Sequence, residues 1–225
     1  TTFFYKQPNP DSVPRIIRLL SAEAMKDPDR QPPLIGLLSS IFRQFPDRVP
    51  EWVALADGQT AKGIVAQALW YADRQQEGLN AIREAGYSES SVEWLGRQPS
   101  TRLIFEISNA DQLDILWGAF FGSGEVRYLF PIAEAIDRVS EDRRIDLEDV
   151  IFAASHVGRE NARLRRDGEK YKRLGRRVLE DYSLAIAALW ALGSNSTQHD
   201  MVRQYIEFRN DTGPDNPVAI ALNRL

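Results

Sequence analysis

The 225-residue sequence contains no cysteine. Disulfide bonds, thiol nucleophiles and cysteine-ligated zinc are therefore excluded. No run of apolar residues approaches the length of about 18 that marks a membrane-spanning helix, so we expect no transmembrane segment. Lysine is also scarce, because the 28 basic residues include only five lysines. Such a bias toward arginine often accompanies GC-rich coding and favours a bacterial source.

Sequence signatures of catalysis and of cofactor binding are missing as well. We find no Gly-x-x-x-x-Gly-Lys-Ser/Thr phosphate loop, no His-Glu-x-x-His zinc motif and no Gly-x-Ser-x-Gly nucleophile turn. The acidic stretch from Asp142 to Asp149 lacks the glycine that a calcium-binding EF-hand loop needs at its sixth position. We interpret this stretch as the acidic start of a helix. The sequence thus predicts no metal and no cofactor, and it favours a non-catalytic protein without deciding the question.

The overall charge is mildly acidic. The chain has 32 acidic against 28 basic residues, with a net charge of -4. General nucleic-acid binders usually carry a basic excess, so we expect no nucleic-acid partner. The sequence begins at Thr1 without a methionine. We expect either a trimmed cytoplasmic chain or an exported, periplasmic one whose signal peptide has been removed; the compartment and the oligomeric state stay open.

Helical periodicity dominates the chain. Apolar residues between 34 and 45 recur at spacings of three and four, and the same spacing holds in 113–121 and, after the turn Gly-Ser-Gly-Glu, in 126–136. These segments predict an antiparallel helical hairpin. Further helices are expected at 12–26, 48–56, 61–73, 76–85, from Asp146 to about 166, at 169–192 and at 197–209. Only the segment 101–108 has a β-like composition, and we interpret it as an extended connector.

Four hairpins with similar features can be aligned by eye. Each has a first helix that ends on an aromatic pair or on Leu-Trp, then a polar turn and a second amphipathic helix. The arrangement resembles tetratricopeptide and other α-solenoid proteins, although the tetratricopeptide consensus is absent. We predict an all-α fold, either an irregular solenoid or a compact bundle of hairpins, in a single domain over 1–225. Its proline-rich ends, about 1–11 and 211–225, are expected to be irregular.

A basic cluster lies between residues 158 and 181. Nine basic and five acidic residues leave a local excess of four positive charges. Some of these arginines repel each other at helical spacing, as Arg173 and Arg177 do, so they do not all stabilise their own helix. The simplest interpretation is a solvated surface, and the sharper one is a docking surface for an acidic protein or an anionic lipid surface. The binding residues predicted here are Arg165, Arg166, Lys172, Arg173, Arg176 and Arg177.

The leading function that follows is a non-catalytic protein–protein interaction module, such as a bacterial adaptor, a chaperone or an immunity-type binding protein. Stacked hairpins generally offer a concave face to peptides or folded partners. Trp117 and Trp190 either fill the space between hairpins or grip a partner on that face. The alternative function is binding of a lipid or another small molecule in an apolar cavity, which Trp117, Phe120, Phe121 and Phe130 would line.

The two histidines offer little chemistry. His156 has Asp149 seven residues before it and Glu160 four residues after it, which places all three on one face of the expected 146–166 helix. Such a set favours a surface salt bridge, and an enzyme that uses Asp149, His156 and Glu160 is a third hypothesis. His199 lies in a polar turn and is expected to be exposed.

Overall fold

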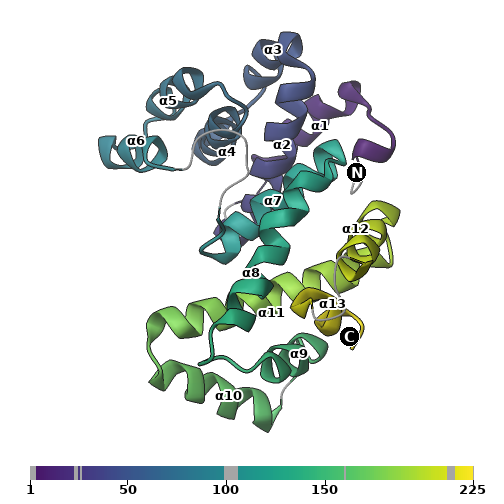
Figure 1. Ribbon diagram of the computed structural model, residues 1–225. Coiled ribbons are helices and arrows are strands. Elements are labelled where there is room, and N and C mark those ends of the chain that lie inside the picture. The colour runs from purple at the N-terminus through teal and green to yellow at the C-terminus, as the bar shows by residue number, and fades with distance from the viewer. Residues whose placement is uncertain are drawn as a thin grey trace. The chain divides into compact units, whose positions relative to one another are not determined.

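The structure is a computed structural model that describes residues 4–22, 25, 27–98, 106–159, 161–211 and 216–224. Within these ranges every regular element is a helix, which confirms the all-α prediction (Figure 1). Contacts divide the chain into two compact units. Unit 1 comprises residues 1–105 and 114–128, and unit 2 comprises 106–113 and 129–225. The single domain and the solenoid stacking stay predictions.

Unit 1 contains six helices and most of a seventh. They are α1 (Val13–Leu19), α2 (Pro32–Gln44), α3 (Val49–Val53), α4 (Gly58–Tyr71), α5 (Gln75–Glu84), α6 (Glu89–Gly96) and, from residue 114 on, α7 (Ala110–Ser123). Helix α4 packs between α2 and α5, and α5 contacts α6. Phe42 and Trp52 stack with their ring centroids 6.2 Å apart and are fully buried in the core. The connector predicted at 101–108 lies largely outside the described residues.

Helices α2 and α7 approach each other until their backbones touch. A Cβ atom on Gly36 would lie 1.9 Å from the carbonyl oxygen of Ile115, and one on Gly118 would lie 2.0 Å from the carbonyl oxygen of Pro33. Only glycine fits at either position, because any side chain would push the helices apart. The apolar stripe predicted at 34–45 thus forms a packed face of helix α2. Gly36 on this face allows the backbone of α7 to approach closely.

Unit 2 is organised around one long helix. Its helices are α8 (Leu129–Glu141), α9 (Leu147–Ser155), α10 (Ala162–Arg173), α11 (Arg176–Ser196), α12 (Asp200–Asp211) and α13 (Pro217–Leu222). Helix α11 contacts the other five, α8, α9, α10, α12 and α13 (Figure 1). Its buried face includes Ala185, Leu189 and Leu192, which are fully covered. The small and leucine side chains allow neighbours to pack on several sides of one helix.

Three expected boundaries in unit 2 are wrong. The helix that begins after Asp146 ends at Ser155 instead of near 166, because Gly158 takes a left-handed backbone conformation with φ of 78°. The 169–192 helix is interrupted at Gly175, whose φ is 114°. Helix α11 then continues to Ser196 through the polar sequence that we had expected to turn.

Candidate binding site

Eight of the nine basic residues of the cluster, all except Arg159, lie on one helical hairpin. Helices α10 and α11 are joined by the two residues Leu174 and Gly175. The positive φ of Gly175 is a conformation that few other residues adopt, and it lets the chain reverse within two residues. Asn161 caps the N-terminus of helix α10, because its side chain accepts a hydrogen bond of 2.8 Å from the Arg163 N–H. We call six exposed cations of this hairpin the basic tip: Arg165, Arg166, Lys172, Arg173, Arg176 and Arg177.

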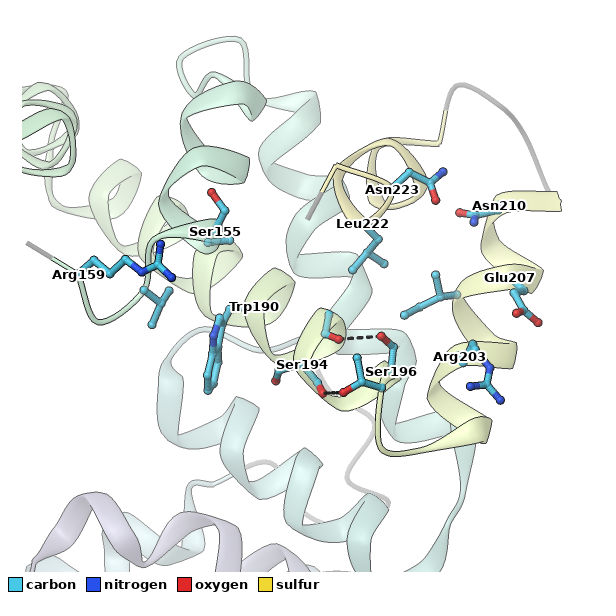
Figure 2. A pocket seen from close by; sticks show the side chains of 15 residues that line it. Ser155, Arg159, Trp190, Ser194, Ser196, Arg203, Glu207, Asn210, Leu222 and Asn223 are labelled. Atoms are coloured by element: carbon cyan, nitrogen blue, oxygen red, sulfur yellow. Dashed lines mark hydrogen bonds between the residues drawn. The ribbon is translucent and has the colours of Figure 1, made fainter. Parts of the chain in front are cut away.

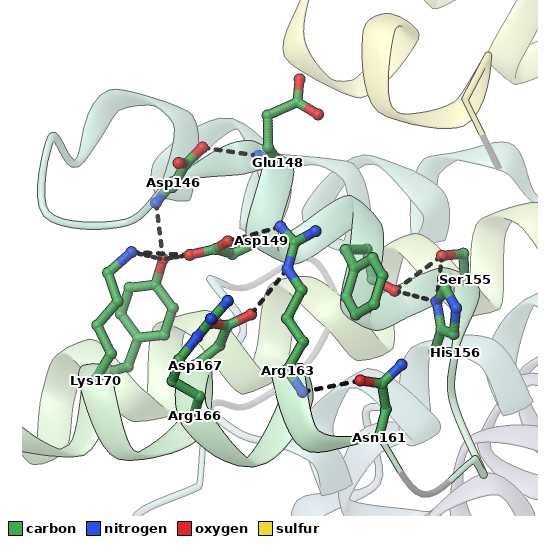
Figure 3. Close-up of polar contacts among 12 residues, drawn as sticks. Asp146, Glu148, Asp149, Ser155, His156, Asn161, Arg163, Arg166, Asp167 and Lys170 are labelled. Carbon is green, nitrogen blue, oxygen red and sulfur yellow. Dashed lines mark hydrogen bonds and ion pairs between the residues drawn. The ribbon is translucent and has the colours of Figure 1, made fainter.

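Two buried carboxylates, those of Asp149 and Asp167, make ion pairs with cations of helix α10. Asp149 of α9 and Asp167 of α10 have side chains that are 11% and 4% exposed. Arg163 donates from Nη2 to Asp149 Oδ1 over 3.0 Å, and its Nε lies 3.4 Å from Asp167 Oδ2 (Figure 3). Arg163 therefore holds both carboxylates and ties α10 to α9.

Asp149 has two further partners. Lys170 Nζ donates to Asp149 Oδ2 over 2.8 Å, and the Tyr171 hydroxyl donates to the same oxygen over 2.8 Å. The Tyr171 hydroxyl also accepts a hydrogen bond from the backbone N–H of Asp146. Burial alone raises the pKa of Asp149, but the hydrogen bonds from Lys170, Tyr171 and Arg163 outweigh it and hold that pKa below its ordinary value. The carboxylate therefore stays ionised and compensates the cations around it.

The exposed cations keep a surplus of charge. Lys172, Arg176 and Arg177 face the carboxylates of Glu169, Glu180 and Asp181 at 3.8, 2.7 and 4.0 Å. Arg166 lies 3.5 Å from Asp167, which already faces Arg163. The five cations of the tip other than Arg165 thus share three surface acids on α10 and α11. Their side chains remain open to solvent: that of Arg176, for example, is 92% exposed.

An apolar residue stands in the middle of these charges. Leu174, in the turn between the two helices, is 46% exposed and lies between Arg173 and Arg176 in the chain. A single exposed leucine is ordinary on a protein surface. Here it gives the basic tip a small apolar centre with cations on either side, an arrangement common in protein interfaces.

The predicted set of Asp149, His156 and Glu160 is not brought together among the described residues. Asp149 turns to α10, whereas the Nδ1 of His156 lies 2.8 Å from the carbonyl oxygen of Phe152 in its own helix. The imidazole also stacks on the Phe152 ring with centroids 4.2 Å apart. Glu160 lies outside the described residues. No group of three or more potential metal ligands occurs in the part of the chain that the structure describes.

His199 differs from its expected position. It is only 1% exposed, because α11 extends to Ser196 and the chain after it folds back into unit 2. The expectation of an exposed His199 is therefore wrong. The polar residues around it in the sequence gave no sign of burial: Ser196 ends α11, and Thr197 and Gln198 form the turn to α12.

The two predicted tryptophans have different environments. Trp117 is 4% exposed and packs on Phe120 and Phe121, with centroids 5.8 Å away in both cases. It is a core residue of unit 1. Trp190, in α11, is 48% exposed and lines a pocket of about 620 Å³ in unit 2 (Figure 2). Only Trp190 offers a surface to a ligand.

Of the four aromatic residues expected to line an apolar cavity, Trp117 and Phe120 are buried and Phe130 is 41% exposed. Phe120 is fully buried against Trp117, and Phe130 of unit 2 lies edge-on to Tyr205 with a centroid distance of 5.3 Å. Phe121 does line an apolar groove in unit 1 of about 470 Å³. The other residues of this groove, which the sequence analysis missed, are Ile16, Leu19, Leu20, Met25, Pro33, Leu34 and Leu37.

Comparison with known proteins does not assign a family. No protein-family model matches the chain, and neither a curated protein nor a solved structure matches it. Among the described helices, none combines the length and the apolar character that crossing a membrane requires. Function therefore has to be inferred from the residues of the candidate sites.

Proposed function

We propose that this protein is a non-catalytic interaction module that binds an acidic partner protein through the basic tip. A bacterial adaptor, a chaperone or an immunity-type binding protein, built from degenerate helical hairpins of the tetratricopeptide kind, fits this proposal. The observation that carries it is the exposed surplus of cations on the α10–α11 hairpin, where five cations of the basic tip besides Arg165 face three surface acids.

The exposed ion pairs of the tip are easily exchanged. A solvent-exposed pair of this kind contributes about 0–1 kcal/mol to stability, since water solvates both ions well. A carboxylate of a partner can therefore replace Glu180 beside Arg176 at little cost. Arginine is suited to this role because its planar guanidinium binds a carboxylate through two parallel hydrogen bonds.

The buried network of hydrogen bonds around Asp149 supports this role. Because Arg163 and Lys170 neutralise Asp149, helix α10 of the hairpin is anchored to α9 by charged hydrogen bonds. An anchored hairpin presents its surface cations in a fixed arrangement, which reduces the entropy lost on binding. The charges that anchor the hairpin are thus distinct from those offered to a partner.

The test is capture from a native extract with the wild-type chain and with a triple variant, Arg173→Glu, Arg176→Glu and Arg177→Glu. We expect the wild type to retain a stoichiometric acidic protein and the triple variant to lose it, while the helical circular-dichroism signal is unchanged. We also expect capture to weaken when salt rises from about 0.1 M to about 1 M, where the Debye length falls from about 10 Å to about 3 Å.

A matched control separates this surface from overall charge. The variant Arg30→Glu, Arg83→Glu and Arg97→Glu changes the net charge equally, and its arginines also pair with nearby acids on the surface of unit 1. It should still capture the partner. Capture that survives in the tip variant, or that both triple variants lose equally, would refute a role for the basic tip.

One observation favours the second candidate function, binding of a lipid or another apolar molecule. The groove in unit 1 is lined entirely by apolar residues, and Leu19 in it is 59% exposed. Extraction of the purified protein followed by mass spectrometry should then reveal a bound lipid that Leu19→Asp removes. A preparation free of lipid that also binds no added fatty acid would dismiss this function.

The third hypothesis, an enzyme that uses Asp149, His156 and Glu160, gains no contact that would support it. Asp149 is occupied by Arg163, Lys170 and Tyr171, and His156 is held against its own helix. We expect His156→Ala to leave thermal stability and metal content unchanged. A loss of bound metal or of an activity in that variant would revive the hypothesis.

A further inference from the structure

A second surface of unit 2, the pocket beside Trp190, is separate from the basic tip. Its walls come from the end of α9, the turn after it, the C-terminal half of α11, and helices α12 and α13 (Figure 2). A volume of about 620 Å³ falls in the range of small-molecule sites. None of the six cations of the basic tip lines this pocket.

One wall of this Trp190 pocket carries a cation, Arg159, that has no counter-ion among the described residues. Arg159 is exposed and makes no ion pair with any residue that the structure describes. The other arginine of the lining, Arg203, is neutralised by Asp200 at 2.6 Å. Glu207 is on the opposite side of the pocket from Arg159 (Figure 2). The Arg159 side of the pocket is therefore suited to an anion.

The middle of the pocket is apolar and contains an aromatic face. Trp190 is nearly half exposed, whereas Leu189 and Leu192 of the same helix are fully buried. Leu222 lies between Trp190 and Asn210 in Figure 2, and Ile206 completes the apolar lining. An exposed indole beside aliphatic side chains is a surface on which a ring can stack.

The far side offers a hydrogen bond. The side-chain oxygen of Asn210 is buried and has no hydrogen-bond partner among the described residues. Buried polar atoms in proteins are nearly always satisfied, so a group that supplies an N–H or O–H to this oxygen would be favoured. Asn223 lines the pocket close to this point (Figure 2).

We propose that the Trp190 pocket binds a small organic anion that carries a ring and a hydrogen-bond donor. The carboxylate or sulfonate of such a molecule pairs with Arg159, the ring stacks on Trp190, and the donor faces Asn210. This inference does not rest on the basic tip, because neither Arg159 nor Trp190 belongs to it.

The test uses two fluorescent probes that differ in one group. 8-Anilinonaphthalene-1-sulfonate has a ring system, an N–H and a negative charge, and N-phenyl-1-naphthylamine lacks only the sulfonate. We expect saturable binding of the sulfonate, which Arg159→Gln weakens about tenfold, as expected when one charge-assisted hydrogen bond is lost. Binding of the neutral probe should be unchanged by Arg159→Gln, and Trp190→Ala should weaken both.

Two controls show where the sulfonate binds. Arg97→Gln removes an exposed arginine from unit 1 and should leave both affinities unchanged. Leu19→Asp alters the apolar groove of unit 1 and should also leave sulfonate binding unchanged. The proposal is overturned if the sulfonate does not bind saturably, if Arg159→Gln binds it as well as wild type does, or if Leu19→Asp weakens it as much as Arg159→Gln.

Discussion

Asp149 shows how a buried charge can stabilise this protein. Its carboxylate is covered by α9 and α10 and accepts hydrogen bonds from Arg163, Lys170 and Tyr171. We predict that Asp149→Asn destabilises the protein by about 1–3 kcal/mol at neutral pH, because two cations lose their shared counter-ion and hydrogen bonds to a charged group are replaced by weaker ones. Urea unfolding followed by circular dichroism measures this difference.

The same carboxylate predicts a dependence on pH. The pKa of Asp149 is lower in the folded protein than its ordinary value of about 3.9. Its contribution to stability is therefore complete above about pH 4 and is lost as the pH falls through the folded-state pKa. The difference between wild type and Asp149→Asn should be constant from about pH 7 to pH 5 and shrink below about pH 4.

Glu169→Gln is the matched control for these measurements. Glu169 is on the same helix, α10, but its side chain is largely exposed and faces only Lys172 at 3.8 Å. We expect a change of less than about 0.5 kcal/mol at any pH. Equal effects of the two substitutions would show that the network of Asp149 is no stronger than a surface ion pair.

The sequence identified the charged residues of this region, but it did not show which of them form ion pairs with each other. The cations of the basic tip were identified from their density alone, and the structure finds them exposed. The partners of Asp149 are 14, 21 and 22 residues further along the chain, in another helix. Only the turn at Gly158 brings them back, and one glycine in a polar stretch does not specify the direction of a turn.

The packing of α2 against α7 gives a prediction at the level of helices. We expect Gly36→Ala and Gly118→Ala each to destabilise the protein by about 1–3 kcal/mol, since an added methyl group would overlap a backbone carbonyl of the opposite helix. Thermal unfolding measures the loss.

The control substitution, Gly168→Ala, should change the stability of the protein in the opposite direction. Gly168 lies inside α10, and a Cβ atom there would meet nothing within 4 Å. Gly168→Ala should stabilise the protein by about 0.5–1 kcal/mol, because alanine is the better helix former. If Gly36→Ala also stabilised the protein, α2 and α7 could not approach each other as closely as the structure shows.

Periodicity predicted helices well and their ends poorly. The stripe at 34–45 corresponds to α2, and the segments on either side of Gly-Ser-Gly-Glu correspond to α7 and α8. The breaks at Gly158 and Gly175 were missed because the residues on both sides continue a helical pattern. The tight contact of Gly36 was also missed, because a glycine within a stripe looks the same whether it faces solvent or a backbone.

The charge of the whole molecule is divided unevenly. The chain carries a net charge of -4, yet the α10–α11 hairpin exposes a surplus of cations. An acidic protein with one basic surface attracts an acidic partner locally and is repelled elsewhere, which favours a single orientation of binding. The overall charge argued against a general nucleic-acid binder, but it did not reveal where the basic surface lies.

From this distribution of charge we expect that the protein does not bind duplex DNA. Binding of duplex DNA without sequence preference requires several simultaneous contacts between cations and phosphates. The basic tip offers six cations, three surface acids of the same hairpin compete for them, and the remainder of the chain is acidic. We therefore expect no retardation of duplex DNA in a gel at a salt concentration of about 0.15 M.

The charge-reversed variant Arg173→Glu, Arg176→Glu and Arg177→Glu makes this experiment decisive. If wild type and variant both leave the DNA free, the basic tip discriminates against the dense charge of a duplex, as expected for a surface with interspersed acids. A band retarded by the wild type alone would mean that the tip binds phosphates, because only the charge of this surface differs between the two proteins. The proposed acidic partner would then be a nucleic acid rather than a protein, and the salt dependence of the retardation would give the number of phosphates contacted.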